Sequence, residues 1–141
     1  MRPKPALLWI HAFLSVNWVV NGVWMIFAPG NWYAQMPQAG DTGPLNEHFI
    51  RDYGSVFFLI GIATLLALAR RLYSRWMHFW IFMFFVAHAA LHVWDMFAGR
   101  LPHYHWNTGF ILVMLPVAAL GALLHPAAWR CETGHFSGGA P

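Results

Sequence analysis

The sequence predicts an all-α integral membrane protein, a four-helix bundle that forms one domain over residues 1–141. Of its residues, 59% are hydrophobic and only 9% are charged, whereas a soluble domain carries about a quarter charged residues. The apolar side chains exceed what one small core can hide, so lipid must surround much of the surface. Four long apolar runs, separated by polar or Gly/Pro-rich segments, complete this prediction.

Each apolar run has a recognisable beginning or end. A membrane-spanning helix needs roughly 20 apolar residues. The runs that fit this length cover approximately residues 7–27, 46–69, 76–97 and 106–124. The first ends before Pro29 and the second before Arg70, while Pro116 predicts a kink in the fourth. Residues 28–45 are expected to form a polar external loop, and residues 125–141 a flexible tail.

The positive charges predict the orientation. Six of the eight Lys and Arg residues fall on one side of the predicted bundle: Arg2, Lys4, Arg70, Arg71, Arg75 and Arg130. Because basic residues favour the cytoplasmic side, both the N and C termini are predicted to be cytoplasmic. The expected location is the bacterial inner (cytoplasmic) membrane, crossed several times. Scattered basic residues do not form a phosphate-binding stripe, so no nucleic-acid partner is expected.

Ionisable residues inside membrane spans are costly and indicate function by default. Here they gather at the predicted periplasmic, or outer, ends of two spans. The second run carries His48 and Asp52 four residues apart, and the third carries His88, His92 and Asp95, each set on one helix face. The second run begins and the third ends at the outer side, so both sets are predicted to lie at one depth on antiparallel neighbours.

Other polar residues fall in the same outer half. They are Asn17 and Asn21 in the first run, and His103 and His105 in the loop before the fourth. The remaining histidines, His11, His78, His125 and His135, are expected on the cytoplasmic side, outside this polar layer. The layer is therefore predicted to contain the functional site.

Imidazoles and carboxylates at one level of a helical bundle predict a transition-metal site. The expected ligands are His48, His88 and His92, with Asp52 or Asp95 as a fourth. A histidine-rich site without thiolates favours Cu, Fe or Zn. Methionines near the outer side favour copper among these metals.

Residues around these ligands have expected supporting roles. Arg51 is expected to neutralise a carboxylate or bind an anionic ligand at the mouth of the site, and Asn21 to lie close by. His103 and His105 are expected to form an access site or a lid. Structural alternatives stay open, because an intramembrane Asn often joins helices by hydrogen bonds and Arg51 can simply form an outer ion pair.

Three functions fit these residues. The leading interpretation is a metal-binding membrane protein, either a copper or iron oxidoreductase or an accessory or assembly factor. The first alternative is a non-catalytic subunit of a larger membrane complex, with a haem or bacteriochlorophyll bound through His88 or His92. Other membrane subunits or further copies of the chain are the expected protein partners. The second is an intramembrane zinc hydrolase, in which Asp52 or Asp95 activates metal-bound water. Whether the chain is an enzyme stays open.

One span also carries a packing signal. Glu47, Gly54 and Gly61 recur every seven residues, so the two glycines share a stripe on which another helix can approach closely. This seam is expected to join helices within the protomer or between subunits.

The stretch from Pro29 to Gly61 resembles a known group of sequences. Its residues 42–54, TGPLNEHFIRDYG, match the segment "TGP-x-N-x-HF-x-RD-x-G" of small, uncharacterised four-helix bacterial inner-membrane proteins. The resemblance covers about a quarter of the chain and implies the fold and location rather than an activity; the layout is also similar to that of DoxX-like proteins. Residues 87–94 loosely resemble the pigment-binding helix of bacterial antenna polypeptides.

Overall fold

The computed structural model describes residues 2–3, 5–36, 39–101 and 109–130. Its elements are strand β1 (Arg2–Pro3), helices α1 (Pro5–Phe27) and α2 (Pro29–Gln35), the 3-10 turn η1 (Ala39–Thr42), helices α3 (Glu47–Ala69), α4 (Arg75–Phe97) and α5 (Gly109–Ala122), the 3-10 turn η3 (Pro126–Ala128) and strand β2 (Trp129–Arg130). Three helices, α1, α3 and α4, are long and apolar enough to cross a membrane. The predicted helical membrane architecture is confirmed at this level, while the predicted fourth span overlaps the shorter α5 and begins outside the described residues.

Local chemistry explains where the long helices begin and end. The Asn46 side chain caps α3 by accepting a hydrogen bond from the amide of Phe49 (3.1 Å), which is the role expected of an N-cap asparagine. Ser74 caps α4 in the same way. After α4, Gly99 has φ 68°, the left-handed conformation that commonly ends a helix.

Two segments are more ordered than the sequence predicts. The expected external loop of residues 28–45 contains the helix α2, which starts at Pro29 because proline is well suited to the first turn of a helix. The hydroxyl of Tyr33 then donates to the Gly43 carbonyl (2.6 Å) and closes the rest of the loop. The expected tail is structured up to residue 130, because Trp129 is buried in the core.

The long helices pack as two antiparallel pairs, α1 with α3 and α4 with α5. Glycines bring α1 and α3 together: a Cβ added at Gly54 would lie 2.6 Å from the Cβ of Met25, and one added at Gly61 2.7 Å from Cγ2 of Val19. A Cβ on Gly22 of α1 would also clash, 2.6 Å from a backbone nitrogen of α3. The predicted glycine seam is therefore confirmed, and it joins helices within the protomer.

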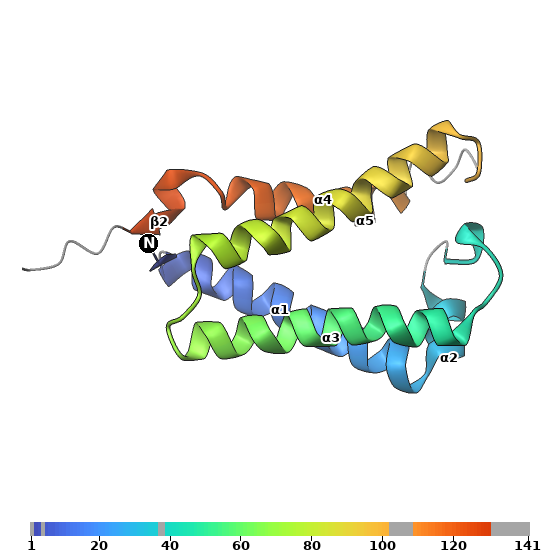
Figure 1. Cartoon of the computed structure of the whole chain (residues 1–141), viewed down its shortest axis with the longest axis horizontal. Helices are drawn as coiled ribbons and strands as arrows, with labels where there is room; N and C mark the ends of the chain where they lie inside the picture. Colours follow the sequence, from blue (N-terminus) through green and yellow to red (C-terminus); the bar gives the residue numbers. More distant parts are fainter. Residues whose placement is uncertain (1, 4, 37–38, 102–108, 131–141) are drawn as a thin grey trace, which may run out of the picture.

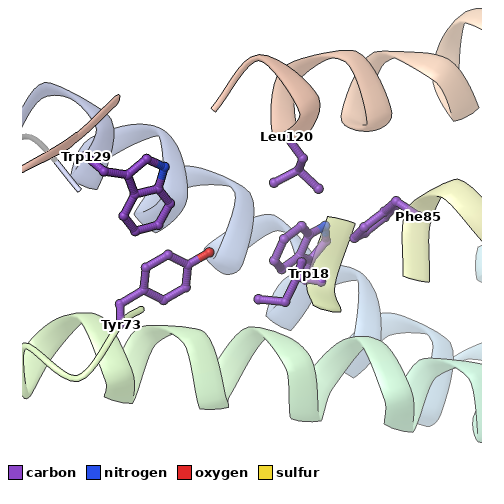
Figure 2. Packing of buried hydrophobic residues seen from close by; sticks show 6 residues of the cluster. Trp18, Tyr73, Phe85, Leu120 and Trp129 are labelled. Atoms are coloured by element: carbon purple, nitrogen blue, oxygen red, sulfur yellow. The ribbon is translucent and has the colours of Figure 1, made fainter. Parts of the chain in front are cut away.

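The two helix pairs meet through aromatic side chains. Trp18 of α1 stacks on Phe85 of α4 with ring centres 5.1 Å apart, and Leu120 of α5 packs beside them (Figure 2). Figure 1 shows that α3 and α4 diverge from the turn that joins them. The prediction that α3 and α4 are antiparallel neighbours is met. They touch through rings, as Phe57 and Phe84 do with centres 6.3 Å apart, and not at close backbone distance, because the glycine face of α3 turns to α1.

The bundle has two distinct ends. At the end we call the termini end, β1 pairs with β2 in antiparallel register, Arg2 opposite Arg130, beside the α3–α4 turn (Figure 1). The opposite end, which we call the loop end, contains α2 and η1. The outer surface is apolar, with Trp9, Phe27 and Phe97 each more than three-quarters exposed. Such a surface fits contact with lipid.

Candidate functional site

The predicted ligands His48 and Asp52 lie together on the surface of α3. The Nε2 atom of His48 is 3.5 Å from Oδ2 of Asp52, so the predicted i, i+4 pairing is confirmed. However, their side chains are 88% and 66% exposed. This pair points away from the helix contacts of the bundle.

The predicted ligands on α4 are better enclosed. His88 and His92 lie edge to face, with ring centres 4.7 Å apart. Across the helix pairs, the hydroxyl of Tyr53 on α3 is 3.1 Å from Nδ1 of His88. We call His88, His92 and Tyr53 the loop-end cluster. Tyr53 joins α3 to α4 at this point and was not among the predicted site residues.

The remaining predicted residues make local contacts. Asp95 binds Arg100 at 2.8 Å, and Arg51 binds Glu47 at 2.9 Å. The Nε atom of Arg51 also donates to the Ile26 carbonyl of α1 (3.3 Å). Arg51 thus forms the ion pair that the sequence left open, but its partner is Glu47 and not Asp52 or Asp95.

The asparagines of α1 bond within their own helix. The amide of Asn17 donates to the carbonyl of Phe13 (3.0 Å), and that of Asn21 to the carbonyl of Asn17 (3.1 Å). His103 and His105 lie outside the described residues. Within the part of the chain that is described, no group of three or more His, Cys, Asp or Glu side chains is placed to hold a metal ion.

A second polar cluster lies at the termini end, where no site was predicted. The side chains of His11 and His78 are buried, at 2% and 0% exposure. Nε2 of His11 is 3.1 Å from Nδ1 of His78. The hydroxyl of Tyr73 is also 3.1 Å from that same nitrogen. We call His11, Tyr73 and His78 the termini-end cluster.

The surroundings of this cluster are closed by aromatic packing. Trp129 stacks on Tyr73 with ring centres 6.3 Å apart (Figure 2), and its indole nitrogen donates to the Leu123 carbonyl (2.8 Å). Burial raises the pKa of Tyr73, which lies in the turn between α3 and α4. Its hydroxyl is protonated at neutral pH, as an ordinary tyrosine hydroxyl is, and can donate a hydrogen bond.

The tautomer of His78 follows from its partners. Its Nε2 is 2.8 Å from the carbonyl of Leu120, and a carbonyl only accepts, so Nε2 carries a proton. In the neutral ring, Nδ1 then has one lone pair. That lone pair faces both His11 and Tyr73, so one acceptor serves two neighbours.

The sequence contained a signal for this cluster. His11 and His78 each lie one or two turns from the termini end of their helices, so they share a depth just as the outer histidines were expected to. Comparing the depths of histidines at the cytoplasmic side, as for those at the outer side, would have predicted that His11 and His78 lie close together. Trp129 gave no such signal, because it follows the last helix in a segment predicted to be a tail.

We found no match to any protein-family model, curated protein or solved structure.

Proposed function

We propose that the chain is an integral membrane protein that binds a transition-metal ion through His88 and His92, with its termini in the cytoplasm and this site in the periplasmic half. The observation that carries the proposal is the loop-end cluster: two imidazoles of one helix lie edge to face, 4.7 Å apart between ring centres, and a tyrosine from the facing pair holds one of them. Imidazole pairs of this kind suit Cu, Zn, Fe and Ni.

Tyr53 supports the proposal by orienting a ligand. When Nδ1 of His88 donates to the Tyr53 oxygen, Nε2 keeps the lone pair that a metal requires. Histidine ligands usually have such a partner on the other nitrogen. His48 and Asp52 would join this site only if α3 and α4 moved together at the loop end, so we propose them as secondary ligands.

Geometry ranks the alternatives. His88 and His92 lie on one face of α4 with ring centres only 4.7 Å apart, too close for a flat macrocycle to lie between them. A haem or pigment would therefore take one of the two imidazoles, not both. The zinc hydrolase ranks last, because Asp52 and Asp95 each make a local contact.

Elemental analysis of the detergent-purified chain tests the proposal. We expect bound Cu, Fe or Zn whose amount falls in His88→Ala and His92→Ala and is unchanged in His125→Asn, a control at the termini end. His48→Ala is expected to weaken binding less than either. A Soret or pigment absorption band would favour the cofactor alternative. Metal content unchanged in both His88→Ala and His92→Ala would refute a site at the loop end.

A further inference from the structure

We propose a second metal site in the termini-end cluster, in which His11 and His78 bind Cu(I) between the two helix pairs. This site is separate from the loop-end cluster and does not depend on the function proposed above. Its residues come from α1 and α4, and Tyr73 from the turn beside them lines the same point.

The two ring nitrogens already face each other. Nε2 of His11 and Nδ1 of His78 are 3.1 Å apart, a hydrogen-bond distance. With two ligands Cu(I) prefers a linear arrangement, in which nitrogens bonded to it at ~2 Å lie about 4 Å apart. The two rings would therefore have to separate by about 1 Å to admit the ion between them.

A hydrogen bond fixes the ring of His78 in an orientation that suits a metal ligand. Its Nε2 proton is held by the Leu120 carbonyl at 2.8 Å, which directs the Nδ1 lone pair into the cluster. A backbone carbonyl on the far nitrogen is a usual partner of a metal-bound histidine. Binding an ion would replace the hydrogen bond between the rings: the Nε2 proton of His11 would move to its Nδ1, and Nε2 of His11 and Nδ1 of His78 would then both direct lone pairs to the metal.

The charged side chains around the termini-end cluster favour a monovalent ion. The acidic side chains in the described parts of the chain all lie towards the loop end: Asp41, Glu47, Asp52 and Asp95. The nearest charged groups to the termini-end cluster on α4 and the α3–α4 turn are arginines, including Arg75. Since no described carboxylate lies at this end of the bundle, a divalent ion would be buried here at a greater cost than a monovalent one. Imidazole suits copper, and Cu(I) carries a single charge.

Cu(I) titration of the full-length chain tests this inference. The protein is purified anaerobically in detergent with His88→Ala and His92→Ala already in place, so that the loop-end cluster does not contribute. We expect about one equivalent of Cu(I) per chain, and weaker binding of Zn²⁺. Copper X-ray absorption should give nitrogen ligands at ~2.0 Å.

Added substitutions identify the ligands. His11→Gln and His78→Gln should each weaken Cu(I) binding by more than about 100-fold, because loss of an outer partner alone costs about 10- to 100-fold. Tyr73→Phe should change it less, and His125→Asn, which removes an imidazole at the same end, should leave it unchanged. In the protein that keeps His11, Tyr73 and His78, Cu(I) should raise Tm.

Three results would overturn the inference. The first is a folded, monodisperse protein that takes up no Cu(I), which would leave the cluster as a hydrogen-bond network. The second is Cu(I) binding that survives both His11→Gln and His78→Gln. The third is tighter binding of Zn²⁺ than of Cu(I). The first result, together with Cu(I) uptake by the unsubstituted chain, would assign the binding to the loop-end cluster alone.

Discussion

The two ends of the bundle use the same pair of side chains in different surroundings. At each end a tyrosine hydroxyl lies 3.1 Å from Nδ1 of a histidine on α4, Tyr73 with His78 and Tyr53 with His88. At the termini end both partners are buried, whereas at the loop end both are half-buried. The residue types and the distances are the same at the two ends, and the two pairs differ in how far other side chains cover them.

Packing explains the difference. At the termini end α1, α4, α5 and the segment after α5 converge on His78, and Trp129 closes the cluster. Towards the loop end the helix pairs diverge (Figure 1), and aromatic side chains such as Tyr53 and His88 bridge them. A closed cluster must have every polar atom satisfied or bound, while an open one is accessible to a ligand from outside.

Removal of Trp129 should have the largest effect, because it opens the termini end. We expect Trp129→Ala to lower the free energy of unfolding by ~3–5 kcal/mol, the usual cost of truncating a buried Trp. Unfolding in detergent by SDS titration measures this. Trp94→Ala, at a position on α4 that is 64% exposed, is the matched control and should cost far less. Equal losses would show that Trp129 does not close the cluster.

Histidine substitutions compare the clusters directly. His78→Ala should cost about 3 kcal/mol or more, because it leaves buried groups of His11, Tyr73 and Leu120 unsatisfied at 1–3 kcal/mol each. His88→Ala should cost about 1 kcal/mol, since one half-buried hydrogen bond is lost. The same SDS titration measures both variants. A loss in His88→Ala as large as that in His78→Ala would contradict the proposed difference in closure.

Much of the fold was predictable because membrane helices carry strong local signals. The apolar runs, the Asn46 cap and the glycines on α3 each act through their own helix or a direct neighbour, so α1, α3 and α4 match the predicted spans closely. The i, i+4 contact between His48 and Asp52 is equally local. Such features require no knowledge of the partner helix.

The arrangement of the helices was less predictable, because it depends on which faces pair. Gly22 of α1 meets the backbone of α3, and this choice of partner turns α3 away from α4 at the loop end. His48 consequently does not share the enclosed face of His88. The termini-end cluster depends on Trp129, whose burial is a long-range contact that no periodic pattern reports. The metal site at the loop end stays a prediction.

Loss of the Tyr73 hydroxyl gives a smaller change with a distinctive pH dependence. Tyr73→Phe should cost about 1 kcal/mol at neutral pH, the net worth of one hydrogen bond. Burial raises the pKa of Tyr73 above its ordinary 10.0. Above pH 10 the unfolded chain therefore releases this proton while the folded chain retains it, so stability falls as pH rises.

The stability advantage of the wild type over Tyr73→Phe should consequently shrink above pH 10, and SDS titrations at neutral and alkaline pH measure it. Phe substitution at Tyr33, whose hydroxyl bonds at the loop end, controls for general alkaline effects. An advantage that is constant with pH would mean that Tyr73 is not buried as described.

The smallest effect should come from His48, the predicted ligand that the bundle leaves exposed. Its contact with Asp52 spans 3.5 Å between side chains that are 88% and 66% exposed, and exposed pairs of this kind contribute less than about 0.5 kcal/mol on a helix. His48→Ala should therefore leave the free energy of unfolding nearly unchanged in metal-free protein. If it also weakens metal binding, the ends of α3 and α4 must approach each other when the ion binds, because the two helices diverge in the free chain. A loss of stability without metal, as large as that of His88→Ala, would instead mean that His48 already packs inside the bundle.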